Sequence, residues 1–191
     1  MEAADLIAIL EASPGLVVID EAYFEFSGQT AVPLLGRYSN LIVLRTFSKA
    51  MGLAALRVGY LLAEADLVRE VAKAVLPYNL NAFSQAAAEV AIEMFASKLA
   101  PLVQKICSER DRVYLELQRI PGLAPVRSRA NFMVVHSQLE PRHVFNELLQ
   151  RDILIRDVSK YPLLQDYFRV SVGTPAENDL LLAALQEIFR A

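Results

Sequence analysis

Three short apolar runs restrict the fold of the first half of the chain more than any other feature of the sequence. The runs lie at residues 16–19, 41–44 and 59–62. Uninterrupted runs of this length are typical of strands that are buried on both faces of a parallel sheet. Segments with helical patterns follow at 64–75, 81–95 and 101–118. Together the strands and helices predict an α/β fold.

The second half of the chain shows a different pattern of predicted strands and helices. Strands are predicted at 131–135, 153–155 and 168–172, and a helix at 141–151. Thr174 followed by Pro175 is typical of a helix start, so a last helix is expected to run to about residue 189. The second half therefore predicts an α+β unit, joined to the first half through the helix at 101–118. Because three strands make a poor parallel sheet by themselves, we expect the first half to be the remainder of a larger domain.

Composition restricts the classes of function. Hydrophobic residues make up 54% of the 191 residues, which is enough for a buried core. The net charge is −3 and the basic residues are scattered, so no nucleic-acid partner is expected. Cys107 is the single cysteine, which excludes an internal disulfide and a cysteine-rich zinc site, and no metal site is expected. The apolar runs are too short to cross a membrane and no signal peptide is recognised, so we expect a cytoplasmic protein.

A first group of polar residues follows the first apolar run. Asp20 ends that run, and Glu21 and Tyr23 come directly after it. In open α/β sheets, ligands bind at the carboxyl ends of the strands, so Asp20 is a candidate ligand-binding residue. The alternative is an aspartate that caps the turn after a strand.

A second group follows the second run. Thr46 and Ser48 supply two hydroxyls, Lys49 is next, and Arg57 comes eight residues later. Hydroxyls and a guanidinium fork suit a phosphate monoester. A lysine beside them suits a Schiff base, because desolvation and a nearby cation lower its pKa. The alternative is a polar loop with an ordinary surface lysine.

The combination of Asp-x-x-Tyr, Ser-Lys and a later Arg resembles the fold-type I enzymes that use pyridoxal phosphate (PLP), in the aspartate-aminotransferase superfamily. Within it, the chain is most similar to the histidinol-phosphate aminotransferases. The stretches that carry the resemblance are 19–26, 45–49, 52–60, 77–81, 84–87, 130–132 and 168–178. The resemblance covers essentially the whole chain and implies the C-terminal portion of such an enzyme. It implies the later part of a PLP-binding large domain with a mostly parallel sheet at 1–96, and a small α+β domain at 97–191.

The resemblance also implies roles in holding the cofactor. Lys49 would carry PLP as a Schiff base and move a proton as general base and acid. Asp20 would pair with the pyridinium nitrogen, and Tyr23 would hydrogen-bond the phenolic oxygen. Ser48 and Arg57 would hold the phosphate, with Thr46 as a helper.

For the substrate, the resemblance implies two arginines of the small domain. Arg169 would grip the carboxylate of glutamate, and Arg156 could meet the phosphate of histidinol phosphate. Arg169 lies within an apolar strand, where an unpaired guanidinium is costly to bury, so a ligand or an acidic partner must satisfy it. Arg156 could instead face solvent.

The implied reaction moves an amino group between histidinol phosphate and 2-oxoglutarate, in histidine biosynthesis, in a homodimer. Two alternatives keep the chemistry close: an aromatic amino-acid aminotransferase and an enzyme like the threonine-phosphate decarboxylases. A third is a catalytically inactive fragment, or a subunit that pairs with a separately encoded N-terminal half. A non-enzymatic α/β binding domain is disfavoured by the joint presence of both polar groups.

Overall fold

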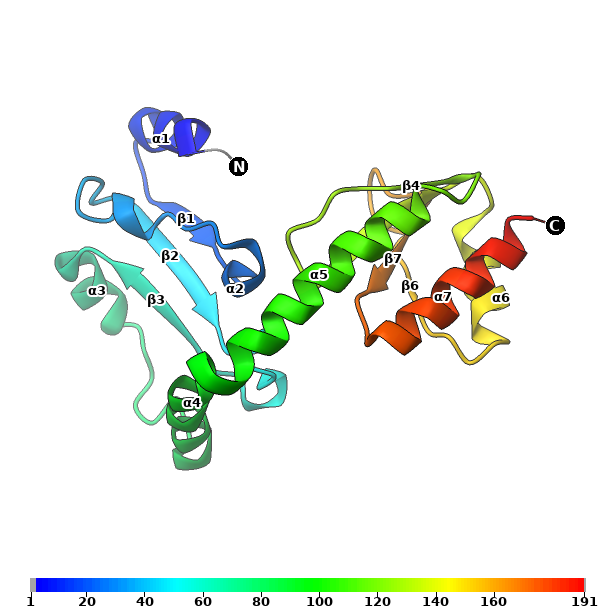
Figure 1. The fold of residues 1–191 in the computed structure, drawn as a ribbon. Helices are drawn as coiled ribbons and strands as arrows, with labels where there is room; N and C mark the ends of the chain where they lie inside the picture. The colour runs from blue at the N-terminus through cyan, green and yellow to red at the C-terminus, as the bar shows by residue number, and fades with distance from the viewer. Residues whose placement is uncertain (1–2, 191) are drawn as a thin grey trace. The chain divides into compact units, whose positions relative to one another are not determined.

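The computed structural model describes residues 3–190, which form two compact units, Met1–Pro101 and Leu102–Ala191 (Figure 1). We call them the N-terminal unit and the C-terminal unit, and describe each by itself. None of the helices in the described part of the chain is long and apolar enough to cross a membrane.

The N-terminal unit contains a three-stranded sheet with helices before and after it. Its elements are α1 (Ala3–Ala12), β1 (Val17–Asp20), α2 (Phe24–Ser27), η1 (Val32–Leu34), β2 (Leu41–Thr46), η2 (Ala54–Leu56), β3 (Gly59–Ala63), α3 (Ala65–Ala72), α4 (Ala82–Met94) and the π-helical turn η3 (Phe95–Leu99). The long helix α5 (Ala100–Leu117) follows η3 directly.

The sheet of this unit is mixed, with β2 between β1 and β3. β1 and β2 run parallel, and Asp20 is the register partner of Leu44. β3 is antiparallel to β2, with Tyr60 opposite Arg45. The segment between β2 and β3 makes a 3₁₀ turn and no crossover helix, so it returns the chain in the opposite direction. The α/β class is confirmed, while the third apolar run proves to be an antiparallel neighbour.

One face of this sheet is buried beneath α1, and the other face is buried only in part. Leu6 and Leu10 of α1 pack on Val17, Leu41 and Val43. On the other face of the strands Ile42 is buried, whereas Val18 and Leu44 are 52% and 36% exposed. Tyr60 in the third run is also 41% exposed. Among the described residues, the prediction of burial on both faces therefore holds for Ile42 and is wrong for Val18 and Leu44, because periodicity does not reveal what covers each face.

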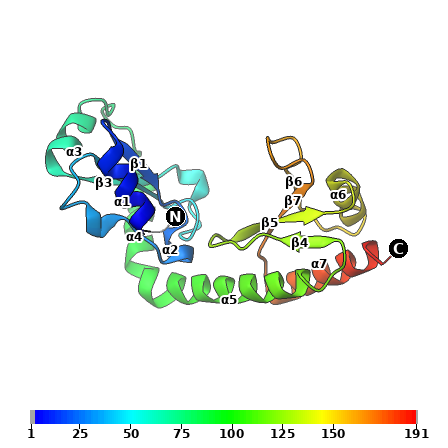
Figure 2. The same ribbon diagram turned by 90° about the horizontal axis from the view of Figure 1, so that it is seen from above.

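The C-terminal unit packs three helices on a four-stranded antiparallel sheet of order β4-β5-β7-β6. Besides α5, its elements are β4 (Leu123–Pro125), β5 (Phe132–Ser137), α6 (Pro141–Leu149), β6 (Arg156–Asp157), β7 (Tyr167–Ser171) and α7 (Pro175–Ile188). In Figure 2, α7 lies beside the later turns of α5. The core of the unit includes Val113, Leu117, Met133, Val135, Leu148, Phe168 and Leu185.

The strand predicted at residues 153–155 is wrong. α6 ends in a turn in which Asp152 takes the left-handed conformation, with φ of 58°. The Ile153 amide then donates to the carbonyl of Leu148, so the helix end uses this backbone group. Strand pairing begins only at Arg156, within the two-residue β6.

Candidate active site

The carboxyl ends of β1 and β2 bring the two polar groups of the N-terminal unit to one edge of its sheet. Asp20 and Leu44 are register partners, and side chains alternate along a strand, so Asp20 and Thr46 project from the same face. Asp20 is exposed, and its Oδ1 accepts a hydrogen bond from the Ala22 amide at 2.9 Å. Asp20 therefore caps the turn after β1, which is the alternative role that the sequence suggested. Its carboxylate is also exposed, so a ligand can reach it.

The loop after β2 holds its hydroxyls in fixed positions. Thr46 Oγ1 donates to the carbonyl of Val58 at 3.3 Å and accepts from the Ser48 amide at 3.1 Å. The amide of Gly52 donates to the carbonyl of Lys49 at 3.0 Å, which closes a turn around the lysine. The loop thus presents Lys49 as an exposed residue on an ordered backbone.

Ser48 and Arg57 lie together, as a phosphate site requires. Arg57 Nη1 donates to Ser48 Oγ at 3.4 Å and to the carbonyl of Ala54 at 3.0 Å. Arg57 is exposed and adopts a left-handed backbone, with φ of 56° and ψ of 42°. Non-glycine residues rarely take this conformation, and it is enriched at ligand-binding sites. A guanidinium and a hydroxyl side by side fit the oxygens of a phosphate monoester.

Lys49 and Tyr23 come from different strand ends and meet. The Lys49 Nζ lies 5.4 Å from the centroid of the Tyr23 ring, within the range of a cation–π contact. Tyr23 stands just before α2. An amine next to a phenol, with Asp20 on the neighbouring strand end, is a donor and acceptor set that fits a planar aldehyde with a phenolic oxygen and a ring nitrogen.

Sequence reasoning assigned no role to one pair of charged residues in this unit. Arg45 and Glu21 form an ion pair that is buried between the strand ends. Their positions in the chain, directly before Thr46 and directly after Asp20, are the signal that could have drawn attention to them.

In the C-terminal unit, the two predicted arginines are neighbours. Arg156 of β6 and Arg169 of β7 are register partners, so their side chains leave the same face of the sheet. Phe168 and Val170 are fully buried against the helices, so Arg169 between them points to the opposite face. The Arg169 guanidinium carbon lies 4.8 Å from the centroid of the Phe132 ring.

These arginines lack anionic partners within the described chain. The Arg169 Nε is buried and has no hydrogen-bond partner among the described residues. Arg156 Nη2 donates to the hydroxyl of Tyr161 at 3.4 Å. No carboxylate of residues 3–190 pairs with either guanidinium, although each of Arg112, Arg119 and Arg151 has one. Two adjacent guanidinium groups without a carboxylate fit an anionic ligand.

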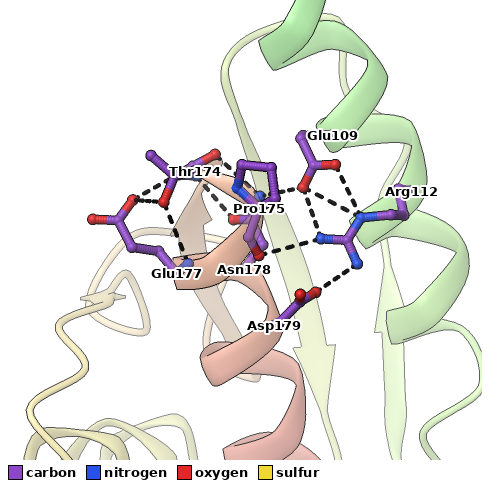
Figure 3. Close-up of polar contacts among 8 residues, drawn as sticks. Glu109, Arg112, Thr174, Pro175, Glu177, Asn178 and Asp179 are labelled. Carbon is purple, nitrogen blue, oxygen red and sulfur yellow. Dashed lines mark hydrogen bonds and ion pairs between the residues drawn. The ribbon is translucent and has the colours of Figure 1, made fainter.

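A network of polar side chains anchors the carboxyl end of β7, the strand that carries Arg169 (Figure 3). Thr174 and Glu177 form a capping box at the start of α7. Asn178 is fully buried and bonds both backbone groups of Gly173, the amide at 2.9 Å and the carbonyl at 3.1 Å. Its amide nitrogen also donates to Glu109 of α5 at 2.9 Å. The end of β7 is thereby tied to α5 and α7.

The carboxylate of Glu109 is stabilised in its charged form. Arg112 donates to Glu109 Oε2 at 2.7 Å and to Asp179 Oδ1 at 2.7 Å. Hydrogen bonds from Arg112 and Asn178 lower the pKa of Glu109 below its usual value. In return, hydrogen bonds to Glu109 and Asp179 raise the pKa of Arg112.

Comparisons with known proteins identify the family to which the chain is related. The family model described as aminotransferase class I and II matches residues 2–185. Histidinol-phosphate aminotransferase 1 of Carboxydothermus hydrogenoformans is 45% identical over 188 residues, which are 97% of this chain and 52% of that protein. Histidinol-phosphate aminotransferase of Thermoanaerobacter pseudethanolicus is 41% identical, over 99% of this chain and 53% of that protein. The chain therefore spans about half the length of these relatives.

Solved structures show the same fold. Histidinol-phosphate aminotransferase from Clostridium acetobutylicum superposes with a TM-score of 0.91 at 22% identity, over all of this chain and 60% of that one. The enzyme from Sinorhizobium meliloti, solved in complex with pyridoxal-5'-phosphate, has a TM-score of 0.86 at 32% identity, over all of this chain and 53% of that one. The resemblance predicted from the sequence motifs is confirmed, and the protein belongs to the class I and II aminotransferase family.

Proposed function

We propose that this chain is part of a PLP-dependent aminotransferase that moves an amino group between histidinol phosphate and 2-oxoglutarate. The observation that carries the proposal is the meeting of Lys49 with Tyr23 and of Ser48 with Arg57 at one sheet edge. The names of the relatives support the substrate pair. We also propose that residues 1–96 are the later part of the PLP-binding domain and residues 97–191 the small domain.

The roles of the site residues follow from their chemistry. When bound, the cofactor supplies an electron sink for the substrate's α-carbon. Arg57 and Ser48 bind its phosphate through charge-assisted hydrogen bonds. The Asp20 carboxylate holds a proton on the pyridine nitrogen, and the Tyr23 hydroxyl orients the phenolic oxygen. Lys49 would hold the cofactor through its amine, and the same amine would be the group that carries a proton to or from the substrate's α-carbon.

We propose that Arg156 and Arg169 bind the anionic groups of the two substrates. A carboxylate or phosphate between them would supply the acceptor that Arg169 Nε lacks and would relieve the repulsion of two like charges. Histidinol phosphate offers a phosphate, and 2-oxoglutarate offers carboxylates. An aromatic amino acid or threonine phosphate would present similar anions, so substrate assays must separate these alternatives.

We further propose a homodimer in the cytoplasm, from the family resemblance. Light scattering of the purified chain tests the dimer. A chain that scatters as a monomer at all concentrations contradicts it.

The first test of the proposed function is covalent trapping of the cofactor. The full chain is mixed with PLP, treated with borohydride and digested, because borohydride reduces a lysine–aldehyde C=N bond to a stable amine. We expect the label on Lys49, and its loss in Lys49→Ala. Lys73→Ala is the matched control, since Lys73 is an exposed lysine of the same unit that pairs with Glu70. Labelling spread over all lysines, or unchanged in Lys49→Ala, contradicts the assignment.

A trapped cofactor without transamination would favour the catalytically inactive alternative. That outcome is separated by a second measurement, the formation of glutamate from 2-oxoglutarate with histidinol phosphate as donor. Product in the wild type and none in Lys49→Ala supports the enzyme.

A further inference from the structure

Arg45 and Glu21 form a buried ion pair in the described part of the N-terminal unit. The Nε and Nη2 of Arg45 donate to Glu21 Oε2 at 3.0 and 2.9 Å. The two side chains are only 14% and 6% exposed. The other oxygen of Glu21 accepts from the Ala31 amide at 2.6 Å, and Thr30 Oγ1 bonds both members of the pair at 2.9 Å.

The guanidinium of Arg45 has two further contacts. Its central carbon lies 3.6 Å from the centroid of the Phe24 ring, a stacking distance. Burial would lower the pKa of Arg45, but hydrogen bonds to Tyr60 and Glu21 outweigh it and raise the pKa. One side chain therefore joins β2 to the residue after β1, to α2 and to β3.

Each of three contacts is one residue away from a predicted cofactor residue. Glu21 follows Asp20, Phe24 follows Tyr23, and Arg45 precedes Thr46. Neighbouring residues of a strand project to opposite faces, so the ion pair lies on the sheet face away from Asp20 and Thr46. The ion pair thus links the backbone segments that carry Asp20 and Thr46, from the opposite face of the sheet.

Stability alone is a weak reason for such a pair. Removing two charges from water costs several kcal/mol per ion, and apolar replacements of buried pairs are often neutral or stabilising. What a bidentate pair does add is a fixed distance and angle between two backbones, because the guanidinium fork accepts a carboxylate in few orientations.

We propose that Glu21 and Arg45 are positioning residues, which hold the ends of β1 and β2 and the start of α2 so that Asp20, Tyr23 and the 46–49 loop stay aligned for the cofactor. The inference rests on the proposed function of these site residues. The inference predicts a local effect. Without the ion pair, the ends of β1 and β2 open more often while the rest of the unit stays folded.

The test is amide hydrogen exchange on the full chain without cofactor. The exchange rates of the Ala22 and Ser48 amides report on the opening of the strand ends, because these amides donate to the side chains of Asp20 and Thr46. In Glu21→Gln and in Arg45→Lys we expect these amides to exchange about tenfold faster or more. Val43, in the middle of the ladder, is the internal reference and should keep its rate. Glu70→Gln, which breaks the exposed pair with Lys73, should change none of them.

A uniform acceleration of all amides, including Val43, overturns the proposal, since it means that the pair only stabilises the unit. Unchanged amides in both variants overturn it as well. If Glu21→Gln fails to fold, Arg45→Lys decides, because it keeps the positive charge while it loses the guanidinium fork and the stacking on Phe24.

PLP affinity is the second readout, measured by equilibrium dialysis. We expect it to weaken about tenfold or more in Glu21→Gln and to stay unchanged in Glu70→Gln. A wild-type chain that binds no PLP refutes the proposed function of the isolated chain, whereas the exchange pattern still decides whether the pair positions the strand ends.

Discussion

Arg156 and Arg169 are register partners on adjacent antiparallel strands, and their side chains leave the sheet on the face away from the core. Two like charges directly opposite each other destabilise a strand pair, by roughly 0.2–1 kcal/mol. We expect an anion bound between them to offset that repulsion, so that ligand binding would stabilise the C-terminal unit.

We expect Arg156→Gln to raise the free energy of unfolding of the ligand-free chain by a few tenths of a kcal/mol, because it removes the repulsion. The same change should weaken the binding of histidinol phosphate about tenfold, since a charge-assisted hydrogen bond is lost. Urea unfolding and calorimetric titration measure the two effects. Arg142→Gln, at an exposed arginine of the same unit, is the control. Equal loss of binding in both variants would contradict the role of Arg156.

The left-handed backbone of Arg57 predicts that a substitution by glycine affects stability and cofactor binding in opposite directions. This conformation costs a non-glycine residue roughly 1–2 kcal/mol, which glycine avoids. Arg57→Gly should therefore keep or raise the free energy of unfolding while PLP affinity falls at least tenfold. Leu163→Gly is a matched control, because Leu163 has φ of 65° and is 88% exposed. It should leave PLP affinity unchanged. Retained affinity in Arg57→Gly would remove Arg57 from the phosphate site.

The capping box of α7 predicts a local effect on stability. Thr174→Ala removes the hydroxyl that accepts from the Glu177 amide, and we expect the free energy of unfolding to fall by about 1 kcal/mol. Thr174→Ser keeps the acceptor and should behave almost as the wild type. Denaturant unfolding measures both variants. A serine variant as unstable as the alanine variant would show that the methyl group, not the cap, is responsible.

The lowered pKa of Glu109 predicts that the C-terminal unit loses stability at acidic pH. Hydrogen bonds from Arg112 and Asn178 lower its folded-state pKa below the ordinary value of 4.5. A lowered pKa means that the folded state holds the proton less tightly than the unfolded state. The contribution of Glu109 is therefore present above about pH 4.5 and is lost as the pH falls through the lower folded value. Asp157 and Glu177 have lowered pKa values too, for which hydrogen bonds to Ser159 and Thr174 are the largest cause.

Glu109→Gln should be less stable than the wild type at pH 7, and the difference should shrink as the pH is lowered. Urea unfolding at a series of pH values from about 7 to about 3 measures this. Glu140→Gln, at a residue without a side-chain hydrogen bond in the cap of α6, is the control and should parallel the wild type. A Glu109→Gln curve that also runs parallel would contradict the linkage.

Much of the fold could be predicted because local patterns record it. The two apolar runs of β1 and β2, the cap at Thr174 and the helix that became α5 are all properties of short segments. The direction of β3 could not be predicted, because it depends on how the segment after Lys49 turns. The short strand β4 was missed, since three residues carry too little pattern.

The sequence by itself determined the residue types of the site and their order: an aspartate and a tyrosine after one strand, then a serine and a lysine after the next, then an arginine. Tertiary structure alone decided that Ser48 meets Arg57, that Arg156 stands opposite Arg169, and that Glu21 and Arg45 pair behind the site. The physical reason is that strand pairing brings together residues far apart in the chain. Its register, which sets the face of every side chain, is a property of two segments at once.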